Sequence, residues 1–189
     1  SYRAMRKRDD NKIQAIRESV LDLCMTEGLS NLTTAKVAQR AGVSPATIYI
    51  YYHGKTDLLS RLYVNIKTEL HAGLATALGT GALADRIQRA LAYSVTQYQA
   101  HPKEAKFLGT LWNAQEMLDD QALAFGQQVD DPLAQLFHEI QADPAYVDAP
   151  VEVIAGFFEI LVGMVQRDPQ LSPAVVATTI TMIVKALKK

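Results

Sequence analysis

Cysteine is nearly absent from this sequence of 189 residues: only Cys24 is present, so the chain cannot form an internal disulfide. A lone thiol suits a reducing compartment, and we therefore expect a cytoplasmic protein. Cys24 follows Ile13, Ile16, Val20 and Leu23 on one apolar helical stripe. That pattern predicts a buried, unreactive thiol rather than a redox sensor.

Long apolar runs and a signal-peptide core are also missing. No uninterrupted apolar stretch approaches the roughly 18 residues that a membrane-spanning helix requires, so no membrane partner is expected. The net charge is only −1, but residues 1–61 carry ten Lys and Arg against six Asp and Glu, whereas residues 62–189 carry nine against fourteen. A basic N-terminal part suits a protein that presents one end to DNA.

Patterns that support catalysis or metal binding are absent too. None of the four histidines follows a Glu by three residues, and the sequence has neither HExxH nor a cysteine–histidine cluster; the histidines are His53, His71, His101 and His138. Gly79-Thr80-Gly81 lacks the preceding strand and the Gly-Lys-Thr/Ser ending of a phosphate loop. We therefore expect no catalytic residues, no metal, no cofactor and no enzymatic activity.

The most informative segment present is residues 33–59, TTAKVAQRAGVSPATIYIYYHGKTDLL. Thr33 and Thr34 are good N-cap residues, and the helix after them should end at Gly42, because a residue without Cβ tolerates a left-handed turn. Ser44 then caps a second helix with Pro45 at its first position. Two short helices joined by such a turn form a helix-turn-helix, whose second helix can enter the major groove of DNA.

This second helix has an unusual composition for a core helix. Tyr49, Tyr51 and Tyr52 fall within four positions and cannot all face one core. Their hydroxyls, and that of Thr47, can bond phosphate oxygens and base edges. Lys55 follows at the start of the next helix, where a cation opposes the helix dipole unless an anion such as a phosphate is close. A helical hairpin with scattered surface tyrosines is the alternative interpretation.

Residues 9–65 resemble the DNA-binding domain of the TetR family of bacterial transcriptional regulators. The matching positions are the Thr-Thr opening, Ala41–Ser44 (AGVS), Thr47–Tyr49, Tyr51–Tyr52, Lys55 and Leu58–Leu59. The resemblance implies an all-α homodimer. Residues 1–54 would form a three-helix helix-turn-helix domain, and residues 55–189 a larger helical domain for ligand binding and dimerisation. The implied partners are double-stranded operator DNA, a second copy of the chain and an unidentified small molecule that releases the DNA.

The same resemblance implies which positions face DNA. They are Thr33, Thr34, Lys36, Ser44, Pro45, Ala46, Thr47, Tyr49, Tyr51 and Lys55. Ala35 and Ile50 are apolar where many relatives carry polar or aromatic contacts, so base readout should rest on few side chains.

Helical periodicity continues beyond this segment. The expected helices cover residues 55–77, 82–99, 102–118, 119–142 with a kink or break near Pro132, 151–166 and 173–187. The first of these should be one continuous helix that connects the DNA-binding domain with the presumed ligand-binding region.

The last two expected helices are too apolar for burial on one side only. A helix that is apolar nearly all round needs a second partner besides its own domain. We expect a two-fold interface built from both helices, with deep burial in a monomer as the alternative. The interface residues expected are Gly156, Ile160, Gly163, Ile180, Ile183 and Val184.

The expected ligand site combines aromatic walls with a few polar groups, as small-molecule pockets do. Its candidates are Tyr93, Gln97, Phe107, Trp112, Gln115, Glu116, Phe125 and Phe158. Most aromatic residues in helical proteins are simply core, which is the alternative for each. Taken together, the sequence predicts a DNA-binding repressor released by a small ligand. The alternatives are a DNA-binding regulator without ligand control and, last, a helical enzyme or carrier.

Overall fold

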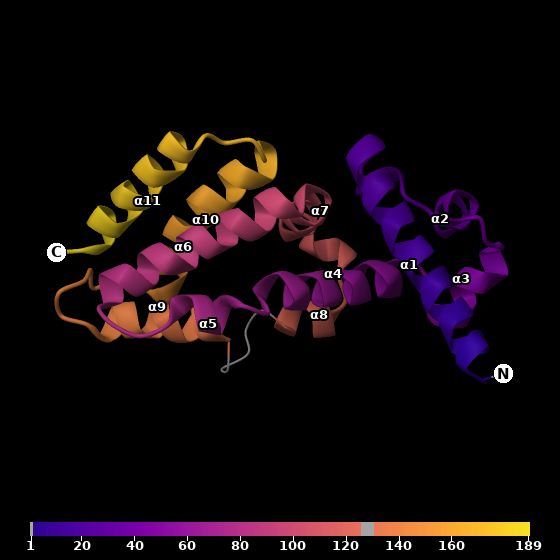
Figure 1. The fold of residues 1–189 in the computed structure, drawn as a ribbon, viewed down its shortest axis with the longest axis horizontal. Coiled ribbons are helices and arrows are strands. Elements are labelled where there is room, and N and C mark those ends of the chain that lie inside the picture. Colours follow the sequence, from indigo (N-terminus) through magenta and orange to yellow (C-terminus); the bar gives the residue numbers. More distant parts are fainter. Residues whose placement is uncertain (1, 126–130) are drawn as a thin grey trace. The chain divides into compact units, whose positions relative to one another are not determined.

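The computed structural model describes residues 2–125 and 131–189, which form helices joined by short loops (Figure 1). In this part of the chain the only pairing of extended segments is an isolated bridge between Tyr146 and Lys188. The predicted all-α class is confirmed. None of the described helices combines the length and the apolar character that a membrane span requires.

Packing divides the chain into two compact units. Unit 1 comprises residues 1–66 and 106–123, and unit 2 comprises residues 67–105 and 124–189. This division differs from the expected boundary between residues 54 and 55. The first turns of α4 (Lys55–His71) belong to unit 1, and they bury Leu58, Leu59 and Leu62 there.

Unit 1 begins with α1 (Tyr2–Thr26), which packs against α2 (Thr34–Ala41), and α2 packs against α3 (Pro45–Tyr51). The 3₁₀ turn η1 (Leu29–Asn31) connects α1 to α2. Part of α7 (Pro102–Trp112), the 3₁₀ turn η2 (Gln115–Met117) and the start of α8 (Asp120–Phe125) complete the unit. Its fully buried side chains include Ile16, Leu21, Ile48 and Phe107.

Cys24 lies in this core with 2% of its surface exposed. Burial raises the pKa of the thiol, against the smaller opposing effects of the Thr110 hydroxyl and Lys106. A thiol that stays protonated and covered is a poor nucleophile. The prediction that the thiol is buried is confirmed.

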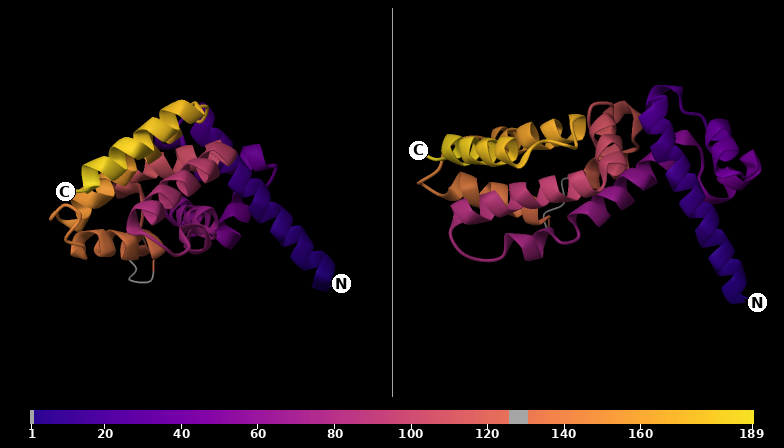
Figure 2. Two further views of the ribbon diagram at one scale, coloured as in Figure 1. Left: turned by 60° about the vertical axis from the view of Figure 1, so that its left-hand side comes forward. Right: turned by 45° about the horizontal axis from the view of Figure 1, so that its top comes forward.

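Unit 2 is organised around α6 (Leu83–Ala100). This helix packs against α5 (Leu74–Leu78), α9 (Pro132–Ala142), α10 (Val151–Arg167) and α11 (Pro173–Leu187). The two further views show α10 and α11 side by side (Figure 2). Both begin and end within about one residue of the predicted bounds.

The prediction of one continuous helix over residues 55–77 is wrong. α4 ends at His71, and a separate short helix, α5, starts at Leu74. The hydroxyl of Tyr93 lies at this break: it accepts the N–H of Gly73 at 2.9 Å and donates to the carbonyl of Leu70 at 2.9 Å. A side chain inserted into the backbone bonding of a helix is a known cause of a kink.

The segment between residues 102 and 142 also differs from the prediction. α7 ends at Trp112 rather than near Leu118, and η2 follows it. α9 begins at Pro132, where the carboxylate of Asp131 accepts the N–H of Leu133 as an N-cap. The part of the predicted kink that falls on residues 126–130 lies outside the described residues.

Candidate nucleic-acid interface

The turn between α2 and α3 has the geometry that its sequence predicts. The Thr33 hydroxyl accepts the N–H of Lys36 at 3.2 Å and caps the start of α2. At the other end Gly42 has φ 68°, the left-handed conformation that glycine adopts without steric cost. Bonds from the N–H of Gly42 to Gln39 and from the N–H of Val43 to Ala38 complete a Schellman motif.

α3 is fixed at both ends and on its inner side. The Ser44 hydroxyl accepts the N–H of Thr47 at 3.2 Å, and Pro45 occupies the first turn. Ile48 is fully buried, and Tyr52, at the end of the helix, is 5% exposed beneath the guanidinium of Arg61. These contacts leave the opposite side of α3 open to solvent.

The exposed side of α3 carries most of the predicted DNA-facing residues. Ser44, Pro45, Ala46 and Tyr49 are exposed, while Thr47 is half-buried. Tyr49 is 57% exposed and Ile50 73% exposed. Thr33 and Lys36 on the neighbouring α2 segment are exposed as well, and Thr34 is half-buried. The structure thus brings these positions onto one turn and the two helices beside it.

Hydroxyl groups on this surface hydrogen-bond one another. The hydroxyls of Thr34 and Tyr49 lie 3.2 Å apart, and those of Ser44 and Thr47 lie 2.9 Å apart. A hydroxyl can donate and accept at once, so each pair keeps capacity for a phosphate or a base edge. The pairs also fix the side chains in place before any ligand arrives.

Tyr51 differs from the other tyrosines on α3. Its hydroxyl donates to the carboxylate of Asp9 on α1 at 2.9 Å. Burial, followed by the hydrogen bond and charge of Asp9, raises the pKa of Tyr51. To bind a phosphate, this hydroxyl must exchange Asp9 for the new acceptor. The sequence analysis did not identify Asp9, because 42 residues separate it from Tyr51.

Two carboxylates near this surface bind other groups of the chain. Lys36 forms an exposed ion pair with Glu27 at 2.8 Å, and such pairs contribute about 0–1 kcal/mol, so Lys36 can change partner at small cost. Lys55 is half-buried at the start of α4. Asp57, in the same turn, accepts the N–H of His53 at 2.8 Å and supplies the negative charge that the helix N-terminus favours.

The predicted ligand residues do not lie in one compact unit. Phe107, Trp112, Gln115 and Glu116 belong to unit 1, whereas the other four belong to unit 2: Tyr93, Gln97, Phe125 and Phe158. Phe107 is fully buried, and Phe158 packs edge-to-face on Phe137 with ring centroids 4.8 Å apart. Both therefore serve as core residues of their units.

Trp112, another predicted ligand residue on α7, does not lie on the same side of the helix as Phe107. Its surface is 49% exposed, whereas Phe107 is fully buried. It follows Phe107 by five residues, which places it about 140° away around the helix axis. The pocket described in unit 2 is a shallow hollow without any of the predicted ligand residues; it is lined by Gly81, Leu83, Arg86, Glu139, Ala142, Asp143 and Pro144.

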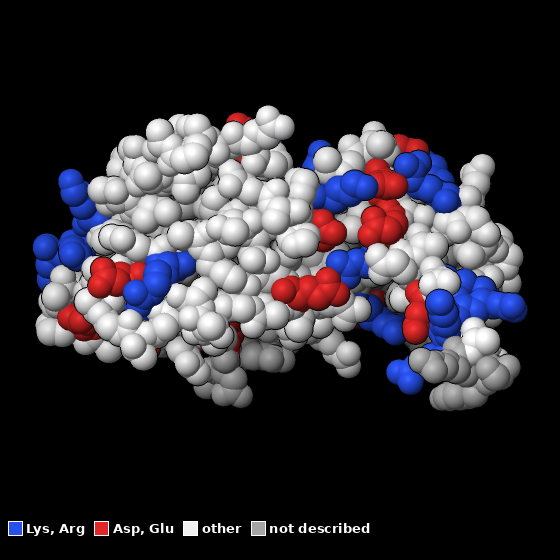
Figure 3. Space-filling model, viewed as in Figure 1, with Lys and Arg blue, Asp and Glu red and all other residues white. Residues whose placement is uncertain are grey.

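The last two helices also carry apolar side chains on their outer surface. Ile154, Phe158, Leu161 and Val165 of α10 are buried in unit 2. The exposed apolar side chains are Val153 and Ile160 on α10, next to the exposed Glu152 and Glu159, and Val175 and Met182 on α11. Figure 3 shows this part of the surface almost without charged residues.

Two of the predicted interface residues are not available to a partner. Ile183 and Val184 are 3% and 6% exposed, because this side of α11 packs inside unit 2. Gly156 and Gly163 are half-buried, and Ile160 is 49% exposed. A Cβ on Gly156 would meet no atom within 4 Å, whereas one on Gly163 would lie 3.3 Å from Arg167 of the same chain.

No group of three or more His, Cys, Asp or Glu side chains is arranged to hold a metal ion within residues 2–125 and 131–189.

Comparison with known proteins agrees with this geometry. Residues 17–62 match the family model described as bacterial regulatory proteins, tetR family. A 64-residue segment is 33% identical to an uncharacterized HTH-type transcriptional regulator, YdeS, from Bacillus subtilis (strain 168). That segment covers 34% of this chain and only 32% of the Bacillus protein.

Solved structures match over nearly the whole chain. A TetR family transcription regulator from Marinobacter aquaeolei VT8 has a TM-score of 0.83 at 20% identity, with 97% of this chain and 99% of that chain covered. A TetR-family regulator from Haemophilus influenzae has a TM-score of 0.75 at 17% identity, with 95% and 98% covered. At such identities the likeness establishes the fold. These relatives are described as transcription regulators. Residues 17–62 thus match the DNA-binding segment of the bacterial tetR family, and the chain as a whole has the fold of solved TetR-family transcription regulators.

Proposed function

We propose that this regulator is a repressor that binds a pseudo-palindromic operator as a homodimer and leaves it when a small molecule binds. The observation that carries the proposal is the presentation of α3. This helix is capped by Ser44, supported from below by Ile48, and exposed along the side that carries Ala46, Tyr49 and Ile50. Such a helix suits the major groove. A repressor of this kind acts in the cytoplasm, where the DNA is.

Within this proposal, phosphate contacts position the helix and base contacts select the sequence. Tyr49, Tyr51 and Lys55 bind phosphates, and Lys36 joins them after it releases Glu27. The Ser44–Thr47 turn lies against base edges. The outward face of α10 and α11 binds the second copy of the chain, so that the two α3 helices of the dimer reach two half-sites.

The first experiment measures DNA affinity at several salt concentrations. Lys55→Ala should weaken binding nearly equally on all sequences and lower the salt slope by about one, because one phosphate contact is lost. The matched control is Lys106→Ala, which removes an exposed cation from α7 and should leave the salt slope unchanged. Equal slopes for the wild type and Lys55→Ala would contradict this role for Lys55.

The second experiment tests release by a small molecule. Trp112 is the sole tryptophan and is half exposed, so its fluorescence can respond to a bound compound. A compound that releases the DNA must bind the DNA-free protein more tightly by the same factor, because coupling between two sites is reciprocal. A release factor of ten to a hundred needs about 1.4 to 2.8 kcal/mol of differential binding. If no fraction of a metabolite extract alters DNA binding, regulation without a ligand is the better description.

A further inference from the structure

The outermost side chains of α3 indicate what this helix reads. Ile48 is fully buried and defines the inward direction. Successive residues of an α-helix are about 100° apart, so Ala46 and Ile50 lie about 20° on either side of the direction opposite Ile48. The two positions that project farthest from the core are therefore both apolar.

The neighbouring polar groups lie to the sides of this apolar pair. Thr47 is hydrogen-bonded to Ser44, and Tyr49 to Thr34, so hydroxyls flank the centre of the surface. Ala46 and Ile50 have no side chain that can donate or accept a hydrogen bond. With 73% of its surface exposed, Ile50 is the most exposed large apolar side chain in the described residues.

A single exposed apolar residue on a protein surface needs no explanation. The position of Ile50 is different, because the proposed function places this surface in the major groove. The floor of that groove presents hydrogen-bonding atoms and one apolar group, the C5 methyl of thymine. An apolar side chain that meets any other base edge would desolvate a polar atom without replacing its hydrogen bond.

We propose that Ile50, with Ala46 beside it, selects thymine in each half-site by contact with the C5 methyl group. This inference rests on the proposed DNA-binding function and adds the chemistry by which one position of the operator is chosen. Ile50 is thereby a specificity-determining residue, although it forms no hydrogen bond with DNA. The hydroxyl pairs beside it supply the polar contacts on either side.

The experiment uses the full-length protein and duplexes that it enriches from a random-sequence library. Each thymine of an enriched half-site is replaced in turn by uracil, which removes only the methyl group. At one or more positions we expect about a fourfold loss of affinity, the effect of one buried carbon. Replacement in both half-sites should give about a fifteenfold loss, since distant effects add as free energies.

The variant Ile50→Ala tests whether this residue is responsible. It should bind the thymine duplex more weakly than the wild type, and it should bind the thymine and uracil duplexes equally. Circular dichroism should show an unchanged fold, since the side chain lies on the surface. Met25→Ala is the matched control: it shortens another exposed apolar side chain of unit 1, 42% exposed, and should keep the preference for thymine.

The outcomes of this experiment distinguish failure of the thymine contact from failure of the proposed DNA-binding function. Affinity that stays within twofold after every uracil substitution would overturn the thymine contact but leave DNA binding intact. A thymine preference that persists in Ile50→Ala would assign the methyl contact to another residue and overturn the role of Ile50. If no duplex is enriched at all, the proposed function itself fails, and the inference fails with it.

Discussion

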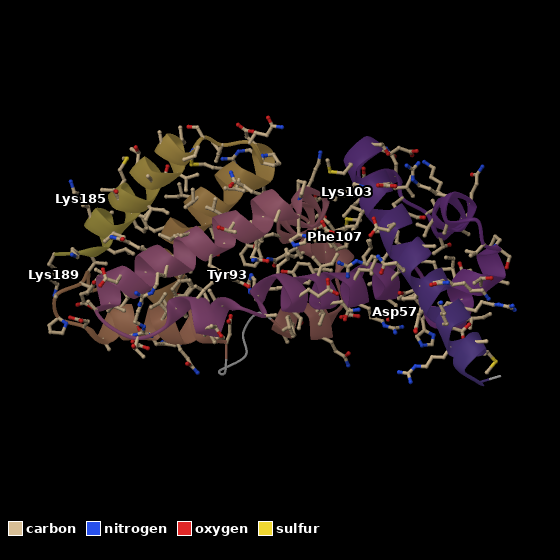
Figure 4. All side chains as sticks on the ribbon, in the orientation of Figure 1. Asp57, Tyr93, Lys103, Phe107, Lys185 and Lys189 are labelled. Carbon is tan, nitrogen blue, oxygen red and sulfur yellow. The ribbon has the colours of Figure 1, made fainter. Side chains whose placement is uncertain are left out.

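The hydroxyl of Tyr93 on α6 binds the N–H of Gly73 at 2.9 Å, at the point where α4 and α5 separate. The same hydroxyl donates to the carbonyl of Leu70 in the last turn of α4, again at 2.9 Å. Figure 4 labels Tyr93 beside this junction. A Cβ built on Gly73 would lie only 2.9 Å from the hydroxyl oxygen, so this close approach requires glycine. One side chain thus satisfies both backbone groups at the break.

Removal of this hydroxyl should destabilise the protein. In Tyr93→Phe the N–H of Gly73 and the carbonyl of Leu70 lose their partner, at a cost of about 1–3 kcal/mol in the free energy of unfolding. Urea denaturation measures this change. Thr96→Val is the control on the same helix, because its exposed hydroxyl bonds only Ala92 and its loss should cost less than about 0.5 kcal/mol. Equal stabilities for the two variants would contradict the role of Tyr93.

Gly73→Ala should destabilise the wild-type protein more than it destabilises Tyr93→Phe. The added methyl collides with the hydroxyl in the first case, and its nearest neighbour is absent in the second. A double-mutant cycle measures this difference, which should be at least about 0.5 kcal/mol for residues in direct contact. Strictly additive effects would mean that the close approach has no energetic consequence.

Asp9→Asn should increase DNA affinity by more than the loss of one negative charge explains. The substitution weakens the hold of residue 9 on the Tyr51 hydroxyl, which can then reach a phosphate. Asp10→Asn is the matched control, because it removes the same charge one residue along the helix. In a Tyr51→Phe background the two variants should bind DNA equally, and fluorescence titration can compare all four proteins. An identical gain for both variants in the wild-type background would exclude a role for Tyr51.

Ile160→Glu should produce monomers. Ile160 is half exposed on α10, so the change should leave the fold of the monomer intact but place a further charge in the dimer interface. Sedimentation measures the mass, and Thr96→Glu, on an exposed position of α6, should remain dimeric. A monomeric wild-type protein would overturn the proposed interface directly.

Acid should lower the free energy of unfolding through the protonation of His71. Burial, with a smaller contribution from Lys67, lowers the pKa of His71, and Asp131 opposes the shift. Because the pKa in the folded state is below about 6.5, the value in the unfolded state, the unfolded chain binds the proton more readily. The contribution of His71 to the free energy of unfolding is therefore fully present above about pH 6.5, and it is lost as the pH falls toward the folded-state pKa. His71→Gln should remove this part of the pH dependence of unfolding; an unchanged profile would contradict the assignment.

The helix-turn-helix could be predicted because its determinants are local. Thr33, Gly42 and Ser44 act on backbone groups within five residues, so the order of residues alone determines the capping bonds. The same reasoning gave the correct bounds for α10 and α11. Periodicity also identified two apolar sides on each of these helices.

The features that the sequence did not reveal depend on distant contacts. The break at Gly73 requires Tyr93, which lies 20 residues further along the chain. The apolar pattern of α11 does not show which side of the helix faces its own unit. Ile183 and Val184 were therefore assigned to the interface side, although they are buried inside unit 2. The exposure of Trp112 was missed for another reason: Trp112 lies about 140° from Phe107 around α7, and helical periodicity was extended beyond the end of this helix at Trp112.

The most direct test of the account is the symmetry and stoichiometry of the DNA site that the protein selects from a random-sequence library. If two copies of the chain each place α3 in a major groove, the enriched site should be an inverted repeat with half-site centres about 34 Å apart, or a multiple of that distance. Sedimentation should find two chains, or a multiple of two, on each duplex. An enriched site without symmetry that binds a single chain, or no enrichment at all, would contradict the account.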